Sequence, residues 1–217
     1  MIKTVFFDLD GVLVDSETMH QKGTEEFLIA KNYDIPKERF YKLIGFHKSL
    51  NPWKEILDGY IPADKQDDFV KELRAFKKAD MDKLDFATII FPEVEDSLKK
   101  LKEMGIYTAC ASSSNMEYIK RVLNSKDLMK YFDLIVTCDD FTKSKPDPEI
   151  YLYCNKKSTF DINECLVVED SKLGIEAGKK AGMKVIARKD HVFGLDQREA
   201  DYFVDDLTGL FDIIEQL

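Results

Sequence analysis

The sequence is poor in residues that cross-link a chain or bind metals through sulfur and nitrogen. It has four cysteines and three histidines among 217 residues. Cys110, Cys138, Cys154 and Cys165 form no CxxC pair and no cluster with histidine, so a zinc site is not expected. Three of them lie in or beside apolar runs, which indicates reduced core thiols in a cytoplasmic protein.

Long apolar runs are also absent. No stretch approaches the roughly 18 residues that a transmembrane helix needs. A strand-like run begins within three residues of Met1, where a signal peptide would otherwise stand. We therefore expect no association with a membrane and no targeting segment.

Positive charge is in short supply. Lys and Arg number 32 against 41 Asp and Glu, which gives a net charge of −9. Nucleic acid is not expected as a partner, because phosphate backbones are bound by clustered Lys and Arg. A small anionic substrate is compatible with this charge, since one lysine and a divalent cation can overcome it locally. The content of 44% hydrophobic and 34% charged residues is typical of a soluble globular protein, with a monomer as the default.

Short apolar runs are present at regular intervals and separated by helix-like stretches. They are near-continuous, as expected for parallel strands covered on both faces. Helical patterns occupy residues 93–104, 115–124, 147–157 and 172–181, with Gly105 and Gly182 as stop signals. Strand and helix thus alternate, which predicts a doubly wound parallel α/β sheet, Rossmann-like in character. The predicted strands are residues 4–10, 106–112, 132–138, 165–170 and 183–188.

Residues 16–85 interrupt this alternation. They show helical periodicity over residues 16–31, 36–44 and 64–80 but contain no convincing strand. We predict an α/β core domain formed by residues 1–15 and 86–217, and an inserted helical domain formed by residues 16–85.

Polar side chains gather where the predicted strands end. Carboxyl ends of parallel strands share one edge of a sheet, and α/β proteins form their sites there. Each group alone is ordinary: a DxD pair is a common turn signal, serines cap helices, and loop lysines are usually solvated. Their joint occurrence at strand ends, in chemically matching types, favours a functional site. The groups are Asp8 and Asp10, Ser112 to Ser114, Lys145, and Glu169 with Asp170.

Together these groups suit phosphoryl transfer. Four carboxylates in one cleft repel each other unless a cation lies among them, and all-oxygen ligands favour Mg²⁺. Serine hydroxyls, loop N–H groups and one lysine are what a phosphate needs. An aspartate can be the nucleophile and form an aspartyl-phosphate, and Asp10 is placed to serve as general acid and base.

The motifs resemble those of the haloacid dehalogenase superfamily, especially its β-phosphoglucomutase-like phosphatases and phosphomutases with a helical cap. The matching segments are DLDGVLVDSE (8–17), Ser112 in CASSS, Lys145 in KSKPDPEIY and VVEDSKLGIEAGKKAG (167–182). The resemblance implies that Asp8 is the nucleophile and Asp10 the general acid and base. It also implies that Ser112, Ser113 and Lys145 hold phosphate. The implied Mg²⁺ ligands are Asp8, Asp10 through its main-chain carbonyl, and Asp170. Glu169 is implied either as a further ligand or as a residue that supports a ligand without touching the ion.

The resemblance is weaker in the helical insert. A mutase of this kind carries an arginine shortly after a cap glycine, whereas Lys48 follows Gly45 here, and lysine cannot make a bidentate fork. Ser114 and Asn115 are followed by Met116, where mutases tend to place a Ser-Lys-Asn set against the distal phosphate. The candidate cap or substrate contacts are His20, Gly45, Lys48, Lys78, Ser114 and Asn115; Lys77 is an alternative to Lys78, and Trp53, Phe46 and Tyr60 are interpreted as cap packing.

Several functions remain open at this point. We expect a Mg²⁺-dependent phosphatase acting on a small phosphorylated metabolite such as a sugar phosphate, with β-phosphoglucomutase as the alternative. A phospho-receiver signalling module is a remote third, because it explains neither the insert nor Glu169-Asp170. GIEAGKK (174–180) fails the P-loop pattern, since only three residues separate its glycines and no Ser or Thr follows the lysine.

Overall fold

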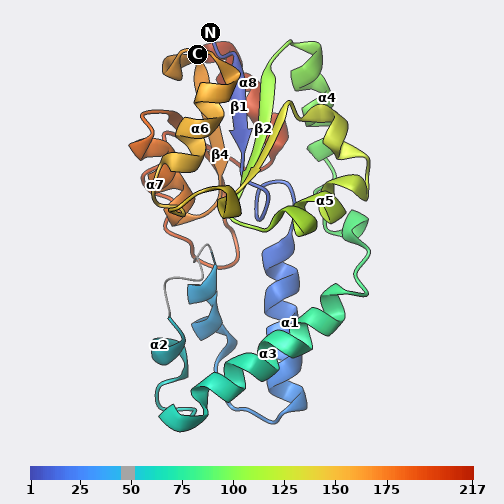
Figure 1. Ribbon diagram of the computed structural model, residues 1–217, viewed down its shortest axis with the longest axis vertical. Coiled ribbons are helices and arrows are strands. Elements are labelled where there is room, and N and C mark those ends of the chain that lie inside the picture. Colours follow the sequence, from blue (N-terminus) through green and yellow to red (C-terminus); the bar gives the residue numbers. More distant parts are fainter. Residues whose placement is uncertain (45–51) are drawn as a thin grey trace. The chain divides into compact units, whose positions relative to one another are not determined.

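The computed structural model describes residues 1–44 and 52–217. Contacts within the chain divide it into two compact units. The core unit comprises Met1–Asp15 and Phe86–Leu217, and the helical unit comprises Ser16–Asp85 (Figure 1).

The core unit is built on a parallel sheet. Within the described residues this sheet has six strands in the order β3-β2-β1-β4-β5-β6, and all neighbours run parallel. The predicted doubly wound fold is therefore confirmed, with one strand more than the sequence indicated. The strands are β1 (Thr4–Phe7), β2 (Tyr107–Ser112), β3 (Leu134–Thr137), β4 (Cys165–Glu169), β5 (Lys184–Arg188) and β6 (Tyr202–Val204).

Helices cover both faces of the sheet (Figure 1). Helices α6 and α7 lie on one face and α4 and α5 on the other. Gly105 and Gly182 have φ angles of +71° and +80°, a region that favours glycine, and they follow α4 and α7 as predicted. The core helices are α4 (Val94–Glu103), α5 (Met116–Asn124), α6 (Glu149–Ser158), α7 (Lys172–Lys180) and α8 (Leu210–Gln216).

The central strand is fully enclosed. All four residues of β1 are buried, and Phe6 packs in one cluster with Val167 of β4, Tyr151 of α6 and Ile175 of α7. Burying such side chains stabilises the fold by about 1.5–3 kcal/mol each. This packing fixes the end of β1, and with it the residues that follow.

The helical unit has its own apolar core. Phe27 lies at the centre of an aromatic cluster, with ring centroids 5.4 Å from Phe69 and 5.6 Å from Phe76. Trp53 packs edge-on at 6.4 Å from Phe40, in agreement with its interpretation as a packing residue. The α-helices described here are α1 (Ser16–Ala30), α2 (Trp53–Leu57) and α3 (Gln66–Met81).

The helical unit also contains shorter helices. Residues Lys37–Leu43, within the predicted helical stretch 36–44, form a 3₁₀ helix. Helix α2 was not predicted, because five residues are too few to show periodicity.

The two chain segments that join the units are tied together on the core side. Asp15 donates its N–H to the carbonyl of Ile89 at 2.7 Å, and Phe91 donates to Leu13 at 3.1 Å. Val14 and Ile90 form an antiparallel bridge between these two hydrogen bonds. The chain thus leaves and re-enters the core unit at one place.

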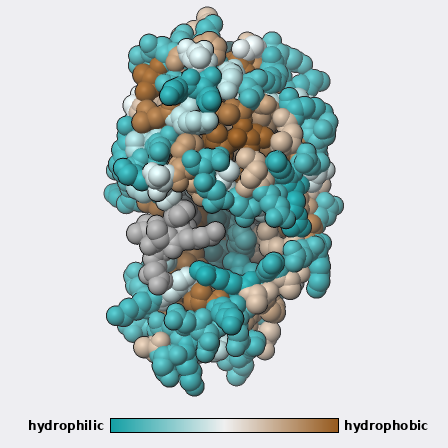
Figure 2. Space-filling view, in the orientation of Figure 1, coloured by the Kyte–Doolittle hydropathy of each residue, from teal (hydrophilic) through white to brown (hydrophobic). Residues whose placement is uncertain are grey.

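The molecular surface fits the composition. The face in Figure 2 is largely hydrophilic, with smaller hydrophobic patches. No helix in residues 1–44 and 52–217 is long and apolar enough to cross a membrane. None of the four cysteines, all within the described residues, forms a disulfide. Burial raises the pKa of Cys154 to about 12 and that of Cys165 to about 11, which fits the predicted core thiols.

Candidate active site

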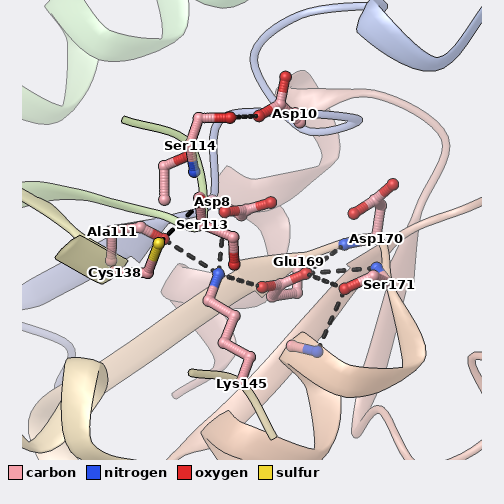
Figure 3. A network of polar contacts seen from close by, with 12 residues as sticks. Asp8, Asp10, Ala111, Ser113, Ser114, Cys138, Lys145, Glu169, Asp170 and Ser171 are labelled. Atoms are coloured by element: carbon pink, nitrogen blue, oxygen red, sulfur yellow. Dashed lines mark hydrogen bonds and ion pairs between the residues drawn. The ribbon is translucent and has the colours of Figure 1, made fainter. Parts of the chain in front are cut away.

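The sheet brings the predicted residues to its carboxyl edge. Because β1 lies between β2 and β4, Asp8 after β1 lies between Ser112 at the end of β2 and Glu169 at the end of β4. Lys145 reaches the same place from the loop that follows β3. Figure 3 shows Asp8, Lys145 and Glu169 directed toward one another, although they are far apart in the sequence.

Lys145 joins three strand ends. Its buried ammonium group donates to Asp8 Oδ1 at 2.9 Å, to Glu169 Oε1 at 2.6 Å and to the carbonyl of Ala111 at 3.0 Å. Burial opposes its charge, but the carboxylates of Asp8 and Glu169 hold the pKa of Lys145 well above its ordinary value. Lys145 is thus a fixed positive charge beside Asp8.

Asp8 lies in a strongly desolvated position. Burial raises its pKa to about 7, and the carboxylates of Glu169 and Asp10 add to the shift against the attraction of Lys145. One ammonium group therefore does not fully compensate the carboxylates around it. The remaining negative charge of these carboxylates would stabilise a further cation in the site.

Glu169 is held from both of its oxygens. Oε1 accepts from Lys145 and from the hydroxyl of Tyr151 at 2.8 Å. Oε2 accepts from the N–H groups of Asp170 and Ser171 and from the Ser171 hydroxyl, at 3.1–3.2 Å. The described residues thus give Glu169 five hydrogen bonds, whereas a carboxylate has about four lone-pair sites.

Two glycines make room for these acids. A Cβ on Gly174, in the first turn of α7, would lie 1.8 Å from Glu169 Oε1. A Cβ on Gly11 would lie 1.9 Å from Asp170 Oδ2, and Gly11 has a φ of +75°. Gly178 likewise allows α7 to pack closely on the sheet, since a Cβ on it would meet Val185 at 2.7 Å.

The two aspartates after β1 face different partners. The strand ends at Phe7, so Asp8 and Asp10 do not share one regular strand face. Asp10 Oδ2 accepts from the Ser114 hydroxyl at 2.7 Å, and Oδ1 accepts from the Tyr118 hydroxyl at 3.1 Å. In Figure 3 its carboxylate lies on the far side of Asp8 from Lys145.

The serines after β2 differ from one another. Ser112 is fully buried, and its hydroxyl accepts from the Ser114 N–H at 3.0 Å, which leaves it able to donate to another group. Ser113 is exposed, and its carbonyl accepts from the Cys138 thiol at 2.9 Å. Asn115 caps α5 through a hydrogen bond from the Tyr118 N–H at 2.9 Å, so the cap is not formed by any of the three serines.

The acidic cluster can accept a hard divalent cation. Asp8, Glu169 and Asp170 are buried, and one carboxylate oxygen from each lies within 4.8 Å of the others. An all-oxygen donor set of this kind fits Mg²⁺. Since the oxygens of Glu169 are already saturated, Asp8 and Asp170 are the carboxylates better suited to bind the ion directly.

Comparison with known proteins establishes the family. The family model described as haloacid dehalogenase-like hydrolase matches residues 5–188. The chain belongs to this family. The predicted resemblance and the expectation of an enzyme are therefore confirmed, and the receiver-module alternative is dropped.

Named relatives of this haloacid dehalogenase-like hydrolase include phosphatases. A phosphorylated carbohydrates phosphatase from Thermotoga maritima is 31% identical over 186 residues, covering 85% of this chain and 84% of that protein. Hexitol phosphatase B from Escherichia coli K12 is 26% identical over 199 residues, covering 85% and 82%. The structure of β-phosphoglucomutase from Clostridium difficile has the same fold, with a TM-score of 0.74, 24% identity and coverage of 100% and 96%.

The candidates in the helical unit have mixed outcomes. His20 lines a pocket of about 150 Å³ together with Lys77, whose pKa is lowered by burial. Lys78 is exposed on α3, and its predicted contact with the substrate or cap stays a prediction. Gly45 and Lys48 lie outside the described residues, so their predicted contacts stay predictions.

Sequence reasoning missed two tyrosines of this hydrolase site. Tyr151 is fully buried under Lys145, whose ammonium lies 5.0 Å from its ring centroid. Tyr118 contacts Asp10. The only signal for Tyr118 was its place in the first turn of the helix predicted directly after the candidate Ser114.

Proposed function

We propose that this protein is a Mg²⁺-dependent phosphatase that hydrolyses a small phosphorylated metabolite through an aspartyl-phosphate on Asp8. The observation that carries this proposal is the buried network of Asp8, Lys145 and Glu169 with Asp170 beside it. The names of two relatives, a phosphorylated carbohydrates phosphatase and a hexitol phosphatase, support a sugar phosphate or related compound as the substrate.

The first step transfers the phosphoryl group to Asp8. An Asp8 carboxylate oxygen attacks phosphorus, the bond from phosphorus to the leaving oxygen breaks, and Asp10 donates a proton to that oxygen. The Lys145 ammonium and the Ser112 hydroxyl hold the transferring group, with Ser113 at the rim. Catalysis of this kind rests on positioning and charge neutralisation.

The second step releases inorganic phosphate. Water attacks phosphorus of the aspartyl-phosphate, Asp10 takes the proton from that water, and the bond to the Asp8 oxygen breaks. The Asp8 carboxylate is thereby regenerated. Asp10 thus acts as acid in the first step and as base in the second.

Asp8 and Asp170, together with the main-chain carbonyl of Asp10, would hold the cation. When bound, Mg²⁺ would supply positive charge that offsets the negative charge of the phosphoryl group and nucleophile. Glu169 would act by fixing Lys145 and the backbone of Asp170, because its oxygens are already engaged. Of the two roles implied for Glu169, a direct ligand or a residue that supports one, this assignment takes the second.

The helical unit would serve as a cap that admits the substrate and excludes water during the first step. His20 and Lys77 are the described residues of that unit that we expect to contact the substrate or to stabilise closure. Their pocket also contains Met19, Met81 and Leu84, which would suit the less polar side of a small molecule.

Hydrolysis is favoured over mutase chemistry by the polar groups after β2. Ser114 donates to Asp10 and Asn115 caps α5, so both already have local roles where a mutase would bind a second phosphate. The first step is nevertheless common to both reactions, and the second acceptor decides between them.

A substrate screen tests the proposal. Purified protein is incubated with a panel of sugar, polyol and aryl phosphates, with Mg²⁺ or with a chelator, and released phosphate is measured. We expect Mg²⁺-dependent release from at least one sugar or polyol phosphate. The panel includes β-glucose 1-phosphate with a trace of bisphosphate. If this substrate is converted to glucose 6-phosphate and no phosphate is released, the result would contradict the hydrolase proposal and favour the mutase. No turnover of any phosphate would contradict both.

A further inference from the structure

The carboxylate of Asp10 is oriented by two hydroxyl groups, one on each of its oxygens. Ser114 donates to Oδ2 at 2.7 Å, and Tyr118 donates to Oδ1 at 3.1 Å. One hydrogen bond still allows the carboxylate plane to rotate about the donor. Two donors on separate oxygens fix both the plane and the direction of the group.

Tyr118 is itself held by a residue at the return of the chain into the core unit. Its ring meets the ring of Phe86 edge-on, with centroids 5.7 Å apart and planes at 79°. Phe86 is the first core-unit residue after the helical unit and is 5% exposed. The Arg121 guanidinium also lies over the Phe86 ring, 4.8 Å from its centroid.

The local sequence explains this arrangement. Asn115 caps α5 by accepting from the Tyr118 N–H, which fixes the first turn of the helix. Ser114 directly precedes the cap and Tyr118 lies in the first turn of α5, and the hydroxyl groups of both reach Asp10. The cap, the serine and the tyrosine thus form one local unit around Asp10.

We propose that Tyr118 is a positioning residue for Asp10, and that its hydroxyl aims the Asp10 carboxylate for proton transfer while its ring is fixed by Phe86. The proposal rests on the proposed function, in which Asp10 accepts the proton of the attacking water. Loss of the hydroxyl should therefore slow hydrolysis of the aspartyl-phosphate. A phosphorylation step with a leaving group that needs no proton should be spared.

The test compares two steps in one variant. Tyr118→Phe removes the hydroxyl and keeps the ring contact with Phe86. The enzyme is mixed rapidly with p-nitrophenyl phosphate and Mg²⁺, and nitrophenol release in the first turnover reports phosphorylation. In a parallel sample the phosphoryl group of the substrate is radiolabelled, and a chase with unlabelled substrate reports the decay of the phosphorylated enzyme. Tyr131→Phe is the matched control, because the Tyr131 hydroxyl lies at an exposed position 3.4 Å from Glu95.

For Tyr118→Phe we expect first-turnover release within about twofold of wild type and decay of the phosphorylated enzyme slowed by about three- to tenfold. Tyr131→Phe should match wild type in both. Phe86→Leu keeps an apolar side chain but removes the aromatic edge, so it should slow decay by a smaller factor. Its effect should be reduced in the double variant with Tyr118→Phe, since the two act on one group.

Other outcomes would overturn the inference. Decay at the wild-type rate in Tyr118→Phe would remove its role in positioning. An equal slowing of both steps, or a loss that follows the fraction of folded protein in thermal unfolding, would assign it a merely structural role. If wild type itself forms no phosphorylated enzyme, the proposed function fails rather than the inference.

Discussion

Replacing Gly174 by alanine would test how closely Glu169 is fitted to α7. The added Cβ would lie 1.8 Å from Glu169 Oε1, whereas ordinary contact begins at 3.4 Å, so the carboxylate must move by about 1.6 Å. Oε1 is the oxygen that accepts from Lys145 and Tyr151. The displacement therefore also disturbs the lysine beside Asp8.

The expected size of the effect follows from the bonds at risk. Losing one or two hydrogen bonds to a charged group costs about 1.5–3 kcal/mol each, against a gain of up to about 1 kcal/mol from alanine in a helix. A net loss of about 2–4 kcal/mol would lower the thermal midpoint by roughly 5–15 °C in a chain of this size. The rate per folded molecule should fall by about 100-fold, because displacements of about 1 Å have such effects.

Two other glycines provide controls for this experiment. Gly178→Ala, on the same helix, would meet Val185 at 2.7 Å without approaching Glu169, so it should lose stability but keep its rate per folded molecule. Gly23→Ala in α1 would meet Lys77 at an ordinary 3.5 Å and should be stabilised by about 0.5–1 kcal/mol. Unfolding is followed by circular dichroism and activity by phosphate release. A Gly174→Ala protein as stable and active as wild type would refute the reasoning.

Three further predictions concern other parts of the core unit. Tyr151→Phe removes the 2.8 Å hydrogen bond to Glu169, so kcat should fall by about three- to tenfold, and a wild-type kcat would contradict the role of that hydroxyl. In the presence of a chelator, the pKa of Asp8 is about 7 in the folded protein and 3.8 in the unfolded chain. As the pH rises from about 4 to 7, the unfolded chain loses this proton while the folded protein keeps it. The free energy of unfolding of the wild type should therefore fall relative to that of Asp8→Asn. Thermal midpoints that stay parallel over this interval would contradict the raised pKa. Glu93→Gln weakens the largely buried ion pair of Glu93 with Arg188, at 2.5 Å, and should cost about 1–3 kcal/mol in urea unfolding; no change in midpoint would show that the pair is solvent-screened.

The sheet could be predicted because parallel strands carry a strong signal. Runs such as 165–170 are apolar throughout, and the structure places β4 at Cys165–Glu169 with every residue buried. β6 escaped prediction because Tyr202–Val204 has three residues, of which Phe203 is 45% exposed, too few to show a pattern. Boundaries at strand ends were less accurate, since β1 stops at Phe7 before the acidic residues begin.

The site could be predicted as a set of groups but not as a network of contacts. Strand order alone brings Asp8 and Glu169 to one edge, so their residue types sufficed to suggest phosphoryl transfer. The saturation of Glu169 by Ser171 and by backbone N–H groups depends on how α7 starts, which no motif states. Tyr151 looked like an ordinary helix residue, because burial of its hydroxyl against Glu169 appears only in three dimensions.

The central claim is that Asp8 carries the phosphoryl group, and trapping it is the most direct test. The enzyme is mixed with Mg²⁺ and an aryl phosphate that it hydrolyses, quenched in acid during turnover, and digested for mass spectrometry. We expect a covalently bound phosphate, the label, on the peptide that contains Asp8. A folded Asp8→Asn variant should show neither this label nor turnover. Turnover with the label on another residue, or with Asp8→Asn still active, would contradict the account.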